Sequence, residues 1–219
     1  MATRQVLAEL VAAYERRSGQ AVTIESVGGV DAARRVEDDE VFDIVVLAAD
    51  AIERLVVSGC VEPASRVGVA RSGIAVAVAA GSARPDIGSE AALRNAVVGA
   101  RSIGYSTGPS GTHLLKLFER WGIAEQIAPR LVKAPPGVPV GGLVARGDVA
   151  LGFQQLSELI HVPGIAVLGE LPPDVQATTV FTAAICTLAR QREAAQALLA
   201  FLVSPEASGA KLANGMTPA

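Results

Sequence analysis

The stretch "FDIVVLAADAIERLVVSG", residues 42–59, indicates the fold class of the chain. Its first half, residues 42–49, is a continuous apolar run of the kind that forms a strand buried on both faces of a parallel sheet. Its second half, from Asp50 onward, predicts a helix with Asp50 as the N-cap. A strand followed directly by a helix is the repeating unit of α/β proteins.

The same alternation precedes this stretch. Residues 3–19 predict an amphipathic helix that ends at Gly19. Residues 21–27, "AVTIESV", predict a strand, and a second helix starts at Gly28-Gly29. The helix of residues 3–19 places five residues on one buried face: Val6, Leu7, Leu10, Val11 and Tyr14.

The alternation also continues to the end of the chain. Ser89 is the expected N-cap of a helix, and Ser204-Pro205 separates two C-terminal helices. Long apolar or β-branched segments predict further strands at residues 73–80, 101–106, 149–153, 164–170 and 175–189. The chain is therefore expected to be an α/β protein of one or two domains.

Composition excludes several classes of protein. Half of the 219 residues are hydrophobic and the formal net charge is -3, so the chain can bury a core and carries no basic stripe for nucleic acid. Its longest apolar run, "SGIAVAVAAG", is too short to span a bilayer. Met1 is followed at once by an amphipathic helix, so no signal peptide is expected.

The sequence contains no motif that points to a metal or to known catalytic chemistry. His113 and His161 have no partner at metal-ligand spacing, so neither a metal nor a cofactor is expected. Cys60 and Cys186 are predicted to be isolated buried thiols, although a disulfide is not ruled out by their number. We find no nucleophile triad, no phosphate-binding loop and no dinucleotide fingerprint.

Turns of small and polar residues open several of the expected helices. They lie at Gly28-Gly29, in "STGPSGTH" at residues 106–113, and at Gly141-Gly142. One interpretation is a set of well-capped helix starts. The other is an anion site, because N–H groups at a helix start point outward and the helix dipole favours negative charge. If the turns face one cleft, the anion site is favoured.

Several long segments resemble the molybdate-type extracellular solute-binding proteins. They are residues 42–81, 86–97, 102–123, 147–159 and 201–216, which together cover most of the chain. The resemblance implies a type II periplasmic-binding-protein fold, in which two α/β lobes joined by two hinge strands hold a small anion in the cleft between them. It also implies a monomer outside the membrane that delivers its ligand to an ABC permease.

The resemblance further implies where the lobes divide. Lobe 1 is expected to comprise residues 1–75 and 184–219, and lobe 2 residues 76–183. The hinge strands are expected near Ile74–Ala80 and Thr178–Ile185, two long apolar segments that flank the middle of the chain.

The resemblance also implies the ligand contacts. In lobe 1 they are expected at Thr3, Gly28, Gly29 and Ala48. In lobe 2 they are expected at the hydroxyl-rich turn and its neighbours: Ser110, Gly111, Thr112 and His113, with Gln155 and Ser157 near the rim. Backbone N–H groups and hydroxyls bind a hydrated anion without a full positive charge.

Two positions depart from the family pattern. Gly29 stands where molybdate binders have a serine, and Phe181 stands near the place of a tyrosine hydroxyl. Gly29 leaves room for a bulkier ligand, and Phe181 is expected to contact that ligand as an apolar wall. Each lost donor forfeits about 1 to 3 kcal/mol, which disfavours molybdate and favours an organic acid. Three functions follow: a solute-binding protein of an importer, a cytoplasmic small-acid sensor, or an isomerase of a small unsaturated acid that uses His113 or Glu158.

The start of the chain is a third departure. Family members open with a strand inside the lobe 1 sheet, ahead of the helix that begins here near Thr3. A lobe 1 sheet without this strand is expected to leave unpaired backbone groups. The resemblance implies a periplasmic protein, and the cytoplasm is the alternative if this N-terminus is native.

Overall fold

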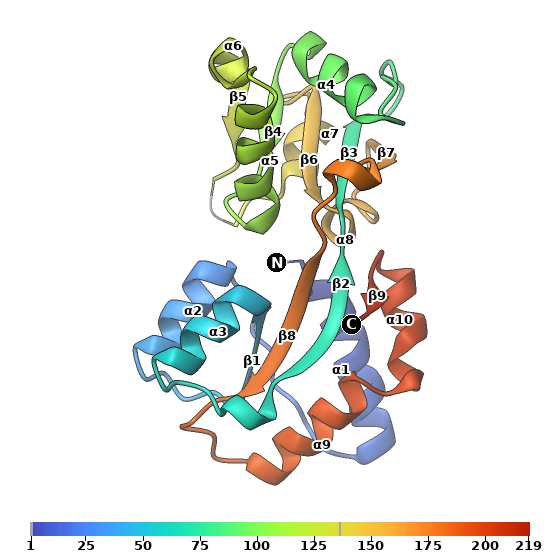
Figure 1. Cartoon of the computed structure of the whole chain (residues 1–219). Helices are drawn as coiled ribbons and strands as arrows, with labels where there is room; N and C mark the ends of the chain where they lie inside the picture. The colour runs from blue at the N-terminus through green and yellow to red at the C-terminus, as the bar shows by residue number, and fades with distance from the viewer. Residues whose placement is uncertain (1, 136) are drawn as a thin grey trace. The chain divides into compact units, whose positions relative to one another are not determined.

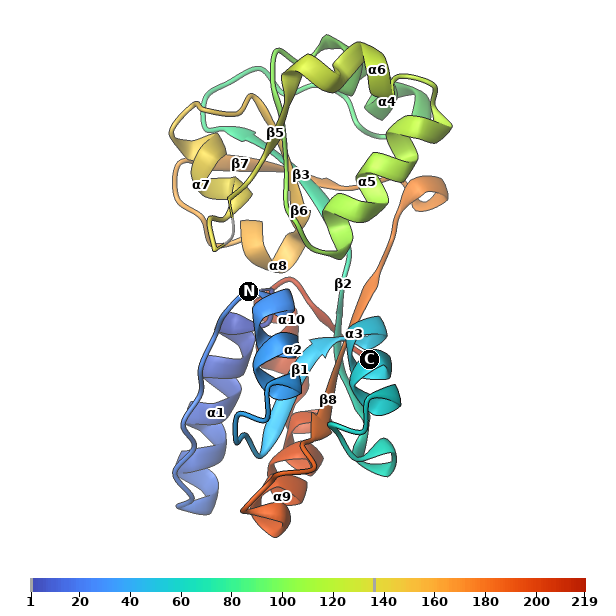
Figure 2. The ribbon, with the colours of Figure 1, turned by 90° about the vertical axis from the view of Figure 1, so that its left-hand side faces the viewer.

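The computed structural model describes residues 2–135 and 137–219 and divides the chain into two compact units. Unit 1 comprises Met1–Arg71 and Thr179–Ala219, and unit 2 comprises Ser72–Thr178. Each unit has a β-sheet with helices packed on it (Figures 1 and 2). The expected α/β class is confirmed.

Unit 1 is built on the sheet β1-β8-β2-β9. Its helices are α1 (Arg4–Ser18), α2 (Gly29–Glu37), α3 (Ala49–Val57), α9 (Arg192–Leu202) and α10 (Ser208–Ala213), with 3-10 turns at Pro63–Ser65 and Pro205–Ala207. Its strands are β1 (Ile44–Ala48), β2 (Val67–Ser72), β8 (Thr179–Ile185) and β9 (Thr217–Pro218).

Unit 2 is built on the sheet β5-β4-β6-β3-β7. Its strands are β3 (Ile74–Ala79), β4 (Ile103–Tyr105), β5 (Leu131–Lys133), β6 (Leu151–Gln155) and β7 (Ile165–Glu170). Its helices are α4 (Glu90–Gly99), α5 (Pro109–Arg120), α6 (Ala124–Ile127), α7 (Val140–Ala145) and α8 (Leu156–Leu159), with 3-10 turns at Ala128–Arg130 and Pro173–Val175. No described helix combines the length and apolarity that a membrane crossing needs.

Local sequence patterns are confirmed where they depend on neighbouring residues alone. The five residues expected on the inner face of α1 are all buried. Ser89 Oγ accepts a hydrogen bond from the N–H of Ala92 at 3.2 Å, as expected of an N-cap. The C-terminal helices α9 and α10 are separated at Ser204-Pro205.

The expected hinge segments lie mostly inside the sheets. The strand β3 is paired on both sides within unit 2, by β6 and β7, so residues 74–79 do not form the connection. The strand β8 pairs along β1 in unit 1 from Phe181 to Ile185. The chain passes between the units at Arg71-Ser72 and at Thr178-Thr179.

The strand β1 differs from its prediction. It pairs antiparallel with β8, with Ile44 opposite Ile185 and Ala48 opposite Phe181, and its burial alternates along the strand. A strand buried on both faces of a parallel sheet was therefore the wrong prediction. Asp50 is also not the N-cap of α3, which is Ala48; the Asp50 side chain instead pairs with Arg54 at 3.1 Å.

Residues 21–27 form no strand, which corrects another prediction. The segment is mostly exposed, and Ile24 is 40% accessible. Within the described residues, β1 is the edge strand of its sheet and pairs with β8 alone, so no strand lies beside residues 21–27 to pair with them. The β-branched residues of "AVTIESV" favour a strand only where a neighbouring strand supplies hydrogen bonds and packing.

Both cysteine thiols are free, as expected. Cys186 is buried, which raises the pKa of its thiol to about 12, whereas Cys60 is only half-buried. The thiols are not isolated from each other, because both pack in the apolar cluster between α3 and the ends of β1 and β8.

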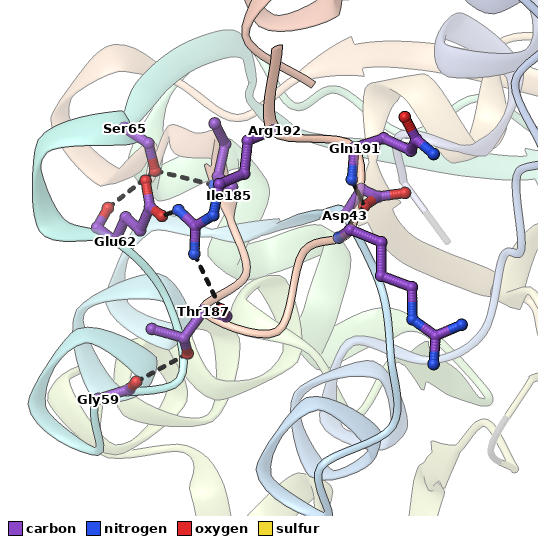
Figure 3. Close-up of polar contacts among 9 residues, drawn as sticks. Asp43, Gly59, Glu62, Ser65, Ile185, Thr187, Gln191 and Arg192 are labelled. Atoms are coloured by element: carbon purple, nitrogen blue, oxygen red, sulfur yellow. Dashed lines mark hydrogen bonds and ion pairs between the residues drawn. The ribbon is translucent and has the colours of Figure 1, made fainter. Parts of the chain in front are cut away.

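A network of polar contacts holds the segment between β8 and α9 against the rest of unit 1 (Figure 3). Asp43 Oδ1 accepts hydrogen bonds from the N–H groups of Arg190 at 2.7 Å and Gln191 at 2.8 Å, just before α9 begins. Ser65 Oγ accepts from the N–H of Ile185 at 2.8 Å. Arg192 forms an ion pair with Glu62 and donates to the carbonyl oxygen of Thr187 at 2.9 Å.

Asp43→Ala is expected to lower the free energy of unfolding of unit 1 by about 1 to 2 kcal/mol, because two N–H groups at the start of α9 lose their acceptor. Denaturant unfolding followed by circular dichroism measures the change. Asp38→Ala, at an exposed position in the same unit, is the matched control. Equal unfolding midpoints for the two variants would contradict this role of Asp43.

Candidate functional site

Three parallel strands of unit 2 end at the same edge of its sheet. The register aligns Tyr105 at the end of β4 with Lys133 in β5 and Phe153 in β6. The helices α5, α7 and α8 follow these three strands along the chain. The first residue of β3, Ile74, pairs with Gln155 at this edge too. In open α/β sheets, ligands bind outside the carboxyl ends of the strands, so this edge is the candidate site of unit 2.

The turn into α5 presents free backbone donors. Gly108 is the N-cap and Pro109, which has no N–H, is the first helical residue. Thr112 was expected to donate to the ligand, but its N–H donates to the carbonyl oxygen of Gly108 at 3.2 Å and its hydroxyl donates to the same oxygen at 3.4 Å. Among the described residues, none accepts from the N–H of Ser110 or Gly111. Ser110 is only 2% accessible, so a ligand oxygen would satisfy donors that water reaches poorly.

Hydroxyl groups hold this turn in shape. Ser110 Oγ lies 3.0 Å from Ser106 Oγ, which also accepts from the N–H of Gly108 at 3.4 Å. Gly111 is required by the turn itself, because a Cβ atom at this position would lie 1.8 Å from the carbonyl oxygen of Ser106. The absence of a side chain at Gly111 thus permits close packing against the end of β4, and not only the approach of a ligand.

His113 follows the turn and is engaged within unit 2. Its Nε2 atom lies 2.9 Å from the carbonyl oxygen of Val175, so this nitrogen carries the hydrogen and donates. Gln176, the next residue, accepts from the N–H of Ile74 at 2.9 Å and donates to its carbonyl oxygen at 3.1 Å. The imidazole therefore links α5 to the segment through which the chain leaves unit 2.

The turn into α7 offers no free donors, which corrects the expectation for Gly141-Gly142. Gln154 Oε1 accepts from the N–H of Val140 at 2.9 Å and of Gly141 at 3.4 Å. The N–H of Gly142 donates to the carbonyl oxygen of Pro139 at 3.0 Å. Gln154 is 3% accessible, and sequence reasoning missed it. This turn is a helix start satisfied by a buried amide.

The two residues expected at the rim, Gln155 and Ser157, are buried. Ser157 Oγ lies 3.4 Å from Ser72 Oγ, and the N–H of Leu156 donates to the carbonyl oxygen of Gly73 at 2.9 Å. These contacts hold the start of α8 against Ser72 and Gly73, the two residues that precede β3. Glu158, in the same short helix, is half-buried, and burial raises the pKa of its carboxyl.

Unit 1 has a corresponding edge at the end of β1. Gly28 is the N-cap of α2 and Ala48 is the N-cap of α3. The two helix starts lie close together, since a Cβ atom at Gly29 would lie 3.8 Å from Leu47 Cδ2. That is ordinary contact, so a serine would fit at Gly29. The α2 start is exposed, and no described residue accepts from the N–H of Gly29.

The two remaining residues expected to contact the ligand, Thr3 and Phe181, are both buried in unit 1. Thr3 is the N-cap of α1 but forms no side-chain capping hydrogen bond, and it is 8% accessible. Phe181 is opposite Ala48 in the sheet and packs in the main apolar cluster of unit 1. A separate surface depression of about 370 Å³ lies along α3, lined by Glu53, Arg54, Val57 and Ser58, away from these helix starts.

Residues 1–217 match the family model described as bacterial extracellular solute-binding protein. The chain belongs to this family. Its fold is that of the type II periplasmic binding proteins. The periplasmic molybdate-binding protein of Azotobacter vinelandii superimposes with a TM-score of 0.82 at 21% identity, covering 98% of this chain and 95% of that one. The substrate-binding domain of a putative molybdenum ABC transporter from Clostridium difficile gives 0.77 at 13%, covering 100% and 95%.

One curated relative is much more similar in sequence. The chain is 37% identical over 216 residues to a protein of Pseudomonas sp named aconitate isomerase, covering 96% of this chain and 82% of that protein. The family and the structural neighbours are binding proteins, whereas this relative carries the name of an enzyme.

Proposed function

We propose that the chain captures a small di- or tricarboxylic acid, with a ligand carboxylate held by the N–H groups of Ser110 and Gly111. The observation that carries this proposal is the pair of unclaimed donors at the carboxyl edge of a parallel sheet. Membership of a solute-binding family supports a small ligand, and delivery to an ABC permease from outside the membrane is part of the proposal.

An organic acid is favoured over molybdate. Neither Gly29 nor Phe181 has a hydroxyl group, and Phe181 packs in an apolar cluster. A tetrahedral oxyanion that leaves water needs several donors, so two missing hydroxyls weaken its binding. The likeness to a protein named aconitate isomerase supports a carboxylic acid instead. That the donors at Gly29 in unit 1 serve the same ligand remains a prediction.

The test is a thermal-shift screen over molybdate, tungstate, citrate and cis- and trans-aconitate, followed by titration calorimetry. A ligand at 100 times its Kd adds about 2.7 kcal/mol of stability, which such a screen detects. We expect a tricarboxylate to bind and molybdate to bind more weakly. A protein stabilised by molybdate alone would contradict the proposal.

Ser110→Ala is expected to weaken binding of the best acid by about 1 to 2 kcal/mol, roughly five- to thirtyfold in Kd, because the hydroxyl that fixes the turn is lost. Calorimetry on Ser82→Ala, an exposed serine elsewhere in unit 2, is the matched control. Equal affinities for the two variants would show that the turn into α5 does not hold the ligand.

A second candidate function is the isomerisation of a small unsaturated acid. Two observations favour it: the 37% identity to a protein of that name, and a half-buried carboxyl, Glu158, at the same edge of the unit 2 sheet. The two functions share the ligand class and differ in whether the ligand leaves changed.

A further inference from the structure

The imidazole of His113 lies beside the turn that carries the free N–H groups. His113 belongs to α5, three residues after Ser110 and two after Gly111. Side chains of a helix lean toward its N-terminus, and residues three apart lie on the same side of it. The half-buried imidazole therefore leans over the turn where the N–H groups of Ser110 and Gly111 have no acceptor among the described residues.

A contact with the end of unit 2 places the same imidazole independently of helix geometry. Its Nε2 atom lies 2.9 Å from the carbonyl oxygen of Val175. The next residue, Gln176, bonds both the N–H and the carbonyl oxygen of Ile74. Ile74 is opposite Gln155 at the carboxyl end of β6. The imidazole is thus held between α5 and a segment that is itself fixed at the carboxyl edge of the sheet.

The contact with Val175 also decides which ring nitrogen of His113 is free. A carbonyl oxygen only accepts, so Nε2 carries the hydrogen and Nδ1 of the neutral ring keeps its lone pair. Among the described residues, none forms a hydrogen bond or an ion pair with Nδ1. An imidazole that is oriented through one nitrogen and free at the other has the arrangement of a general base.

We propose that Nδ1 of His113 removes and returns the proton when the chain isomerises a small unsaturated polycarboxylic acid. This inference rests on the second candidate function above and on the turn into α5 as the place where a ligand carboxylate is held. Imidazole suits the step because it gains and loses a proton near neutral pH. A purely structural link to Val175 needs only a donor, which an amide side chain supplies as well.

The proton step balances without an oxidant or a cofactor. Nδ1 takes a proton from the methylene carbon next to the double bond, and the C–H electron pair forms a new double bond while the former one opens toward its far carbon. The imidazolium then returns the proton to that far carbon. In propene-1,2,3-tricarboxylic acid this moves the double bond by one carbon, so the cis and trans forms interconvert.

The free N–H groups of α5 support this step. As the proton leaves the methylene carbon, negative charge spreads onto the carboxylates of the acid. Hydrogen bonds from the N–H groups of Ser110 and Gly111 to one of these carboxylates stabilise that charge where it develops. Because the base and the donors belong to one helix, their spacing is fixed before the acid binds.

The experiment uses the full chain with cis- and trans-aconitate. Interconversion is followed by proton NMR, proton removal by deuterium incorporation into the methylene group in D₂O, and binding by calorimetry. His113→Gln keeps an N–H donor for Val175 but has no base. It is expected to lower kcat and deuterium incorporation by at least about 100-fold, while Kd changes by less than about fivefold. His161→Gln, at the other histidine of the chain and exposed in unit 2, is the matched control.

The outcomes separate this inference from the proposed function. Parental turnover in a folded His113→Gln variant overturns the inference and leaves the second candidate function standing. If that variant does not fold, His113→Ala is measured with and without added imidazole, which is expected to restore part of the turnover; no restoration overturns the inference. Binding of a tricarboxylate without interconversion by the parent chain also overturns it and leaves the binding function standing. Failure to bind any carboxylic acid refutes the binding function itself.

Discussion

Gly111→Ala is expected to destabilise unit 2 by about 3 kcal/mol and to weaken ligand binding more than tenfold. The added Cβ atom would lie 1.8 Å from the carbonyl oxygen of Ser106, which is backbone and cannot move aside as a flexible side chain can. The turn would have to open, and the N–H groups of Ser110 and Gly111 would be displaced. Denaturant unfolding and calorimetry measure the two effects.

Gly99→Ala provides the control for this change. Gly99 ends α4 in the same unit, and no heavy atom lies within 4 Å of a Cβ atom built there. Alanine at that position is expected to be neutral or to stabilise by up to about 1 kcal/mol, since it restricts the unfolded chain. If Gly111→Ala unfolded at the same denaturant concentration as Gly99→Ala, the turn into α5 would not be the close-packed structure described here.

Gln154→Leu is expected to cost about 2 to 4 kcal/mol of stability, because it leaves the buried N–H groups of Val140 and Gly141 without an acceptor. Gln154→Glu keeps an acceptor oxygen for these N–H groups. The glutamate variant should therefore be more stable than the leucine variant.

Gln126→Leu, at an exposed position on α6, controls for the loss of an amide as such. Unfolding midpoints are measured for the three variants and the parent chain. A Gln154→Leu protein as stable as the Gln126→Leu protein would mean that water or another group replaces the amide, and that the start of α7 does not depend on Gln154.

Much of the fold could be predicted because its signals are local. The apolar face of α1, the Ser89 cap and the break at Ser204-Pro205 depend on residues a few positions apart. The direction of β1 could not be predicted in this way, because its partner β8 comes from the other end of the chain. The strand predicted for residues 21–27 was wrong for the same reason, because a strand forms only where a neighbouring strand pairs with it.

In the candidate site, too, the features that could be predicted are the ones with a local sequence signal. The turn at Ser110 could be found because glycine, proline and hydroxyl residues at a helix start have a local meaning. Gln154 was missed because a lone amide in a strand gives no sign of the N–H groups that it meets from α7. A usable signal was present: two glutamines end a strand, β6, that is buried throughout. Buried amides need partners, so such a pair marks a place where the backbone of another element requires an acceptor.

The division of unit 1 into two chain segments has a consequence for biosynthesis. Unit 2 is continuous from Ser72 to Thr178, so it can fold on the ribosome as soon as those residues have emerged. The strand β1 must wait, because its partner β8 is translated only after the whole of unit 2. During that interval α1 to α3 expose their apolar faces, and a nascent chain stalled before residue 179 should depend on chaperones until β8 arrives.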